Sequence, residues 1–227
     1  MNNNRTPFAA AIFDMHGTLI DNTPYHFKAW QRLFKENGLQ ELSRETYLAE
    51  ISGVPIKNTI EFFFGDDLDE VERIKIARRK QQLYEEAFKP FLLPVNGLET
   101  FLFDLKNLGV EIALATSSNM ADVDFIFEGI AIRQYFDALI IGSMVNEPKP
   151  SPQIFLKAAE QLNVKPEKCL VFEDSIAGLK AGRNAGMKVA GITTAHPATT
   201  VTKLADMVIN DYTDINLHIM AALFDNE

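Results

Sequence analysis

The chain has 227 residues, of which 47% are hydrophobic and 23% are charged, enough for one large domain or for one core with an inserted module. Its formal net charge of −9 argues against a general nucleic-acid surface and against an anionic-membrane surface. No apolar run approaches the roughly 20 residues of a membrane span, and the opening MNNNRTPF has no apolar stretch typical of a signal peptide, so we expect a cytoplasmic protein.

The first predicted element is a buried parallel strand that ends at a carboxylate. The run Ala10–Phe13 is apolar throughout, as a strand covered on both faces must be. Asp14 follows at the carboxyl end, where open α/β sheets place ligands. His16 then precedes a turn in which Gly17 lets the backbone approach a ligand closely. This segment is therefore the first candidate for a functional site.

A long helical segment interrupts the pattern from about 22 to 91. One predicted apolar stripe consists of Trp30, Leu33 and Phe34. A charged helix follows Asp67, and its predicted inner face consists of Val71, Ile74, Ala77 and Leu83. We interpret this segment as a helical insert after the first strand.

Strand-like and helix-like patterns alternate through the rest of the chain. Apolar β-type runs occupy 110–116, 137–142, 169–174, 188–193 and 206–211. Amphipathic helical patterns occupy 97–107, 152–162 and 176–185. This alternation predicts the α/β class, with a parallel sheet and right-handed crossovers. The only cysteine, Cys169, lies in an apolar run, so we expect a buried structural thiol.

Polar groups follow several of these runs in a recognisable order. Thr116 follows VEIALA, Lys149 lies in EPKPSPQIF, and Glu173 and Asp174 follow CLVF. Together with Asp14, they resemble in order and spacing the motifs of the haloacid dehalogenase superfamily of phosphohydrolases, whose first motif reads D-x-D-G-T. The run YHFKAW is most similar to its β-phosphoglucomutase branch.

The resemblance implies a Rossmann-like parallel-sheet core, made of residues 1–21 and 92–227, with a helical cap domain at 22–91. In the family this cap closes over the active site, so the connections near 21–24 and 90–96 would be hinges. We expect a monomer that acts on a small phosphorylated metabolite, with neither nucleic acid nor membrane as a partner.

The resemblance also implies roles for the charged residues. Asp14 would attack phosphorus and form an aspartyl-phosphate, while Lys149 and Mg²⁺ offset the negative charge. The carboxylates of Asp14 and Asp174 would hold Mg²⁺, which prefers oxygen ligands. The family adds the backbone carbonyl of the residue at position 16, His16 here. Glu173 would be a further acidic residue that orients metal-bound water or Lys149.

Phosphate oxygens need hydrogen-bond donors, and the segment after the second strand offers several. The hydroxyl and backbone N–H of Thr116 are the first candidates, and Ser117, Ser118 and Asn119 follow. Ser118 or Asn119 could equally be a helix N-cap. Gly17 would let the backbone come close to the same phosphate.

His16 departs from the family pattern, because it replaces the second aspartate of D-x-D-G-T. In the family, that aspartate protonates the leaving oxygen and later activates water or a sugar hydroxyl. Losing such a group typically costs about 10²–10⁴-fold in rate. An imidazole can do both tasks in principle. Two interpretations stay open: His16 performs this role, or it marks an impaired or silent enzyme.

Several residues of the helical insert match family positions less well. His26 matches a histidine that links the cap to the acid–base group. Lys80 matches a second phosphate-binding lysine, although a solvated helix face is the more ordinary interpretation. Ile56 occupies the place of a phosphate-binding arginine, with Lys57 one position away. Glu50 falls where some relatives select inorganic pyrophosphate.

These departures argue more strongly against the binding of a second, distal phosphate of the substrate than against phosphoryl transfer at a single phosphate. We therefore expect a Mg²⁺-dependent phosphatase of a small phosphorylated metabolite, foremost a sugar phosphate. A β-phosphoglucomutase is the second candidate, and a catalytically silent phosphometabolite-binding protein is the third. A haloacid dehalogenase is disfavoured, since that chemistry needs no Mg²⁺ and the Glu173–Asp174 pair is present.

Overall fold

The computed structural model describes residues 8–51, 54–215 and 217–224. The chain divides into two compact units. The larger consists of Met1–Asp21 and Leu93–Glu227, and the smaller of Asn22–Leu92. No helix among the described residues is long and apolar enough to cross a membrane.

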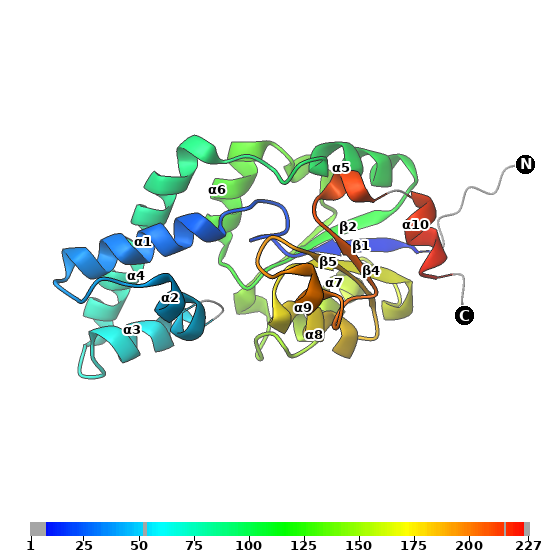
Figure 1. Ribbon diagram of the computed structural model, residues 1–227. Helices are drawn as coiled ribbons and strands as arrows, with labels where there is room; N and C mark the ends of the chain where they lie inside the picture. The colour runs from blue at the N-terminus through cyan, green and yellow to red at the C-terminus, as the bar shows by residue number, and fades with distance from the viewer. Residues whose placement is uncertain (1–7, 52–53, 216, 225–227) are drawn as a thin grey trace, which may run out of the picture. The chain divides into compact units, whose positions relative to one another are not determined.

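The larger unit is built on a six-stranded parallel sheet (Figure 1). Its strands are β1 (Ala10–Phe13), β2 (Glu111–Ala115), β3 (Ala138–Ile140), β4 (Cys169–Glu173), β5 (Lys188–Ile192) and β6 (Met207–Ile209). Their order is β3-β2-β1-β4-β5-β6. The predicted α/β class is confirmed, and each strand lies within a predicted β-type run.

Helices cover both faces of this sheet. They are α5 (Leu98–Asn107), α6 (Met120–Ile130), α7 (Gln153–Gln161), α8 (Ile176–Asn184), α9 (Ala198–Val201) and α10 (Leu217–Ala222). Short 3₁₀ turns are η2 (Arg133–Tyr135), η3 (Gly142–Met144), η4 (Pro166–Lys168) and η5 (Tyr212–Asp214). Figure 1 shows α5 on one face and α7 and α8 on the other. Helix α6 was not among the predicted helices.

The central strand pair is β1 with β4, and it forms the middle of the core. Every residue of both strands is buried, and the stacked rings of Phe13 and Phe172 have centroids 4.6 Å apart. Cys169 is fully buried as expected, and this burial raises the pKa of its thiol to about 12. The strand order reverses between β1 and β4, and such a switch point leaves a crevice outside the carboxyl ends of the strands.

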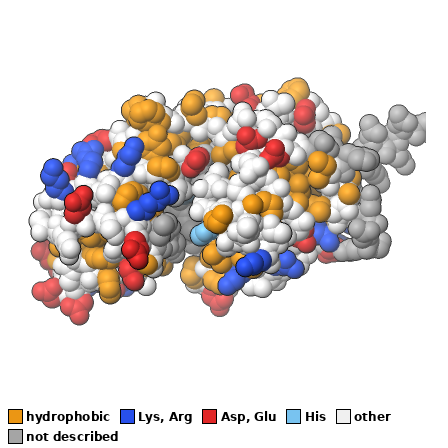
Figure 2. Space-filling view, viewed as in Figure 1, with side chains coloured by type: hydrophobic (Ala, Val, Ile, Leu, Met, Phe, Trp, Pro, Cys, Tyr) orange, Lys and Arg blue, Asp and Glu red, His pale blue; other side chains and the backbone are white. Residues whose placement is uncertain are grey.

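The smaller unit is helical. It contains α1 (Thr23–Glu36), α2 (Arg44–Glu50), α3 (Ile56–Phe64), α4 (Glu70–Phe88) and the 3₁₀ turn η1 (Lys89–Phe91). The predicted stripe of Trp30, Leu33 and Phe34 is buried. Figure 2 shows charged side chains of both signs on the surface of this unit, in keeping with the 2.7 Å ion pair between Arg79 and Glu36.

The inner face of α4 differs from the prediction. A capping box between Asp69 and Glu72 starts the helix. Val71 and Ile74, predicted to face inward, are 60% and 41% exposed. The buried stripe lies further along the helix, at Lys80, Leu83, Tyr84 and Phe88. Only this later part of α4 has its apolar side chains covered, so the first two turns remain at the surface.

Candidate active site

Three carboxylates meet at the carboxyl ends of the two central strands. Asp14 follows β1, Glu173 ends β4, and Asp174 comes next. Because Phe13 pairs with Phe172 in register, these side chains reach the same edge of the sheet. Each contributes an oxygen within 4.8 Å of the others, and all three residues are buried. We call this group the acidic cluster.

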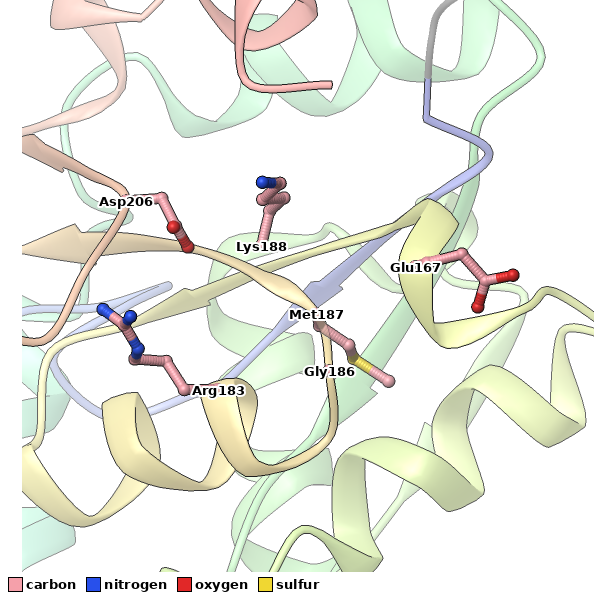
Figure 3. Close-up of a pocket in the computed structure, with 6 residues that line it drawn as sticks. All are labelled: Glu167, Arg183, Gly186, Met187, Lys188 and Asp206. Atoms are coloured by element: carbon pink, nitrogen blue, oxygen red, sulfur yellow. The ribbon is translucent and has the colours of Figure 1, made fainter. Parts of the chain in front are cut away.

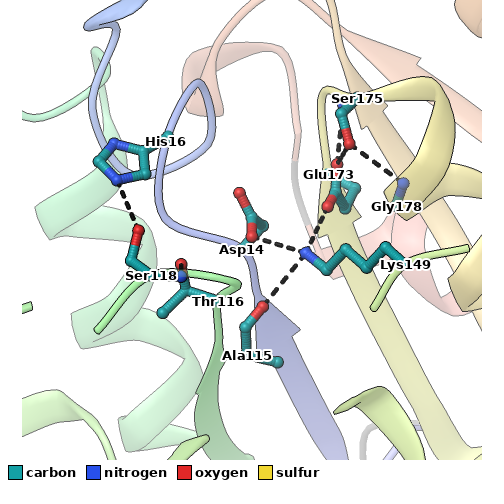
Figure 4. A network of polar contacts seen from close by, with 9 residues as sticks. All are labelled: Asp14, His16, Ala115, Thr116, Ser118, Lys149, Glu173, Ser175 and Gly178. Carbon is teal, nitrogen blue, oxygen red and sulfur yellow. Dashed lines mark hydrogen bonds and ion pairs between the residues drawn. The ribbon is translucent and has the colours of Figure 1, made fainter. Parts of the chain in front are cut away.

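Lys149 supplies a positive charge to the acidic cluster. Its Nζ donates hydrogen bonds to Asp14 Oδ1 and Glu173 Oε1, both at 2.6 Å, and to the Ala115 carbonyl at 3.3 Å (Figure 4). Burial alone would lower the pKa of Lys149, but the charges of Asp14 and Glu173 outweigh it and raise the pKa above its ordinary value. The ammonium therefore stays charged, and the structure brings Asp14, Lys149 and Asp174 together.

Glu173 is held through both of its carboxylate oxygens. While Oε1 accepts from Lys149, Oε2 accepts from the backbone N–H of Ser175 at 2.8 Å and from its hydroxyl at 2.9 Å. Ser175 also caps α8 by accepting from the Gly178 N–H. A Cβ at Gly178 would overlap the Glu173 carboxylate, so the helix start is shaped around this side chain.

The donor set of the acidic cluster fits a hard divalent cation. Burial, and then repulsion from Glu173 and Asp14, raise the pKa of Asp174 well above its ordinary value. A bound cation would remove that repulsion, and carboxylate oxygens are the ligands that Mg²⁺ prefers. Gly17 packs against Asp174 so closely that a Cβ there would overlap its carboxylate.

The segment after β2 differs in part from the prediction. The backbone N–H of Thr116 donates to the Ile140 carbonyl at 2.9 Å, within the sheet. The expectation that this N–H binds phosphate is therefore wrong, whereas the expectation for the Thr116 hydroxyl is not affected. The buried Thr116 hydroxyl accepts from the Ser118 N–H at 3.2 Å and keeps its own hydrogen to donate. Asn119 is the N-cap of α6, accepting from the Asp122 N–H at 3.0 Å. Ser117 is exposed.

The His16 side chain contacts the start of α6. Its Nε2 lies 2.9 Å from Ser118 Oγ and 2.7 Å from Asp122 Oδ2. In the view of Figure 4, the ring and Lys149 lie on opposite sides of Asp14. Asp122 is only 6% exposed, and no sequence motif singled it out. The available signal, an acid three residues after an N-cap asparagine, predicts only a helix start.

Of the four candidate residues in the smaller unit, two are packed together in its interior contacts and two are exposed. The Lys80 Nζ lies 2.8 Å from His26 Nδ1, and the His26 ring stacks on Tyr84 with centroids 4.1 Å apart. Lys80 is only 8% exposed, so its interpretation as part of a solvated face is wrong: it packs among aromatic rings, with its ammonium 5.3 Å from the Tyr84 ring centroid. Glu50 ends α2 and Lys57 lies in α3, both exposed.

A separate cavity of about 170 Å³ lies in the larger unit (Figure 3). Its lining is Glu167, Arg183, Gly186, Met187, Lys188 and Asp206. Since Lys188 begins β5, the cavity adjoins the opposite ends of the strands from the acidic cluster. It is smaller than the roughly 300–1,000 Å³ of ordinary ligand pockets.

Comparisons with known proteins agree with this geometry. A family model described as haloacid dehalogenase-like hydrolase matches residues 11–192. A phosphorylated carbohydrates phosphatase of Thermotoga maritima is 32% identical over 184 residues, covering 79% of this chain and 82% of that protein. The β-phosphoglucomutase of Bacillus subtilis is 31% identical over 228 residues, covering 93% of each. A solved structure of a HAD hydrolase, family IA, variant 3, from Entamoeba histolytica has a TM-score of 0.88 and 26% identity, covering 96% of this chain and 99% of that one.

Proposed function

The chain belongs to the haloacid dehalogenase-like hydrolase family, and on that premise we propose that it is a phosphatase of small phosphorylated carbohydrates. The observation that carries the proposal is the buried contact of Lys149 with Asp14, beside Asp174. The substrate class is supported by the Thermotoga maritima relative, which is named a phosphorylated carbohydrates phosphatase.

In the proposed reaction, a carboxylate oxygen of Asp14 attacks the phosphorus of a phosphate monoester. A bond forms between Asp14 and phosphorus while the bond to the sugar oxygen breaks, and that oxygen takes up a proton. Water then attacks the phosphorus of the aspartyl-phosphate, which releases inorganic phosphate and restores Asp14. Ester and water are thus converted into alcohol and phosphate.

Other residues of the larger unit position the phosphate and move the proton. The charged Lys149 offsets negative charge as it develops, an effect that is strong in a buried site. The hydroxyl of Thr116, with Ser117 and Ser118, donates to phosphate oxygens, and Gly17 gives the backbone room to approach. His16 gives a proton to the leaving oxygen and accepts one from the attacking water.

Magnesium completes the proposed site. It would be held by the carboxylates of Asp14 and Asp174 and by the backbone carbonyl of His16, with Glu173 orienting Lys149 through the contact described above. When bound, the ion supplies positive charge next to the phosphate oxygens.

The test is phosphate release from a panel of sugar phosphates with Mg²⁺. The variants are Asp14→Asn, which loses the nucleophile, and His16→Asp, which restores the family pattern. We expect turnover by the parent at least about 10³-fold above Asp14→Asn. A silent parent with an active His16→Asp variant would instead indicate a phosphometabolite-binding protein. Silence of both would exclude the phosphatase.

A hexose-phosphate mutase is the second candidate, and two observations favour it. The Bacillus subtilis relative is named a β-phosphoglucomutase, and the smaller unit, which we assign as the cap domain, contains the contact between half-buried His26 and buried Lys80. A mutase would interconvert hexose phosphates only with a hexose bisphosphate as activator. Phosphate release without isomerisation in that assay would exclude it. Lys57 and Glu50 are proposed as further substrate contacts.

A further inference from the structure

The His16 ring is held by two acceptor groups at one nitrogen. Asp122 Oδ2 lies 2.7 Å from Nε2 and Ser118 Oγ lies 2.9 Å from it. The shorter contact is to a carboxylate, and hydrogen bonds to ionised acceptors are both shorter and stronger than neutral ones. The contact with Asp122 is therefore expected to dominate the orientation of the ring.

This geometry fixes which ring nitrogen carries hydrogen. An ionised carboxylate only accepts, so a bare Nε2 would set two lone pairs against each other at 2.7 Å. Nε2 must therefore carry hydrogen and donate it to Asp122, with Ser118 Oγ as a second acceptor. In the neutral ring, Nδ1 is then the proton-accepting nitrogen.

The trio of Ser118, His16 and Asp122 has a different geometry from a catalytic triad. In a triad the serine and the aspartate contact different ring nitrogens, so that the histidine can take the serine proton. Here both contact Nε2, so His16 cannot activate Ser118 in this arrangement. The contacts are suited to holding the ring.

The start of α6 places Asp122 for this contact. Asn119 caps the helix through the Asp122 N–H, which puts the Asp122 side chain in the first turn. Side chains in a helix lean towards its N-terminus, and here that is the side of Ser118. A carboxylate is also favoured electrostatically in the first turn.

We propose that Asp122 is a positioning residue that holds His16 in one rotamer and one tautomer for the proton transfers of the reaction. The inference rests on the proposed function, in which His16 takes the place of the second aspartate of the family motif. Asp122 then supplies what a histidine needs there and an aspartate does not: a fixed ring orientation and a defined proton position.

A double-mutant cycle tests this coupling. We expect Asp122→Ala to lower kcat about 10–100-fold, as losing the partner of a functional histidine commonly does, with KM changed less than about twofold. In the His16→Ala background, the same change should have no further effect. Asp122→Asn, whose amide oxygen can still accept from Nε2, should recover part of the loss. The exposed Asp124 of the same helix is the matched control, and Asp124→Ala should leave kcat unchanged.

An undiminished kcat in Asp122→Ala, or a loss that persists in the His16→Ala background, would overturn the proposal. Should the alanine variant fail to fold, Asp122→Asn takes its place in the comparison of kcat with and without His16.

A second readout does not depend on activity. It is ¹⁵N NMR of the four histidines, in which the signals of His16 are identified by their loss in His16→Ala. At mildly alkaline pH we expect the Nε2–H pattern in the parent and a tautomer mixture in Asp122→Ala. If the parent is inactive but shows the Nε2–H pattern, the proposed phosphatase activity is refuted and the contact between Asp122 and His16 is not. If the parent itself shows a mixture of tautomers, that contact is refuted.

Discussion

Gly17 shows, at the scale of single residues, how little room the acidic cluster leaves. Its φ is +75°, and a Cβ there would overlap the Asp174 carboxylate. Gly109 has a φ of +73° with no atom within 4 Å of a built Cβ. Alanine at either position should cost about 1–2 kcal/mol in backbone strain. Only Gly17→Ala should also displace Asp174, the proposed metal ligand, and we expect kcat to fall about 100-fold, because a misplacement of about 1 Å can have that effect.

Thermal unfolding and phosphate release separate the two effects. Similar losses of stability in the two variants, with activity lost only in Gly17→Ala, would support the close packing of Gly17 against Asp174. Equal activity in both variants would show that Asp174 tolerates displacement.

At the ends of strands, the sequence predicted which carboxylates lie close together, while their roles in catalysis stay predictions. Asp14 comes directly after one apolar run and the Glu173–Asp174 pair directly after another, and parallel strands bring their carboxyl ends to one edge. Asp122 had no such signal, because it lies in the first turn of a helix and not at the end of a strand. The burial of Lys80 was also missed, since a lysine beside two arginines reads as solvated until the aromatic rings around it are known.

At the scale of elements, the N-cap of α6 links stability to the candidate site. Asn119→Ala removes the cap and should cost about 1 kcal/mol, or about 2–4 °C in unfolding temperature for a chain of this size. Ser43→Ala removes the corresponding cap of α2, where Ser43 accepts from the Thr46 N–H. Both variants should lose similar stability, but only Asn119→Ala should lower kcat, because α6 carries Asp122.

Differential scanning fluorimetry and steady-state kinetics provide these measurements. Asn119→Asp keeps a capping side chain and should keep both stability and activity. A raised KM in Asn119→Asp, with stability unchanged, would instead indicate that Asn119 binds substrate, as the family resemblance also allowed.

The sequence predicted the strands better than the helices. A buried parallel strand is a short apolar run, and every strand lies within such a run. For α6, the sequence offered only the N-cap alternative at Ser118 or Asn119. The helix itself was not assigned, because its apolar residues include three in succession at 125–127, which hides a helical period. The buried face of α4 was predicted to begin too near its N-terminus. Periodicity shows which residues share one face of a helix, but it does not show which turns of that face are covered by other side chains.

At the scale of the whole molecule, Mg²⁺ should stabilise the fold through the acidic cluster. A ligand that binds only the folded state at 100 times its Kd adds about 2.7 kcal/mol. We therefore expect the unfolding temperature to rise with Mg²⁺, and Asp174→Asn to abolish that rise. Asp206→Asn, in the separate cavity, is the control and should respond as the parent does. A parent that shows no shift in saturating Mg²⁺ would contradict the proposed metal site.

Cys169 reports on opening of the whole core. Burial raises its thiol pKa from an ordinary value of 9.0 to about 12, so little thiolate forms at neutral pH. A thiol reagent at pH 8 should modify the native protein very slowly and the denatured protein at once. Because the folded state favours the neutral thiol, this contribution to stability is complete below about pH 9 and is lost as pH rises towards 12. Rapid labelling under native conditions would contradict the burial.

The strand order also has a consequence for biosynthesis. Strand β1 is made early but lies in the middle of the sheet, and one of its edges pairs only with β4, beginning at Cys169. At about 5–20 residues per second, a ribosome needs roughly 10–30 s to pass from one strand to the other. During that interval the nascent chain presents an unpaired edge, which is a template for aggregation. The topology that brings Asp14 to its partners thus makes the growing polypeptide a candidate client for chaperones.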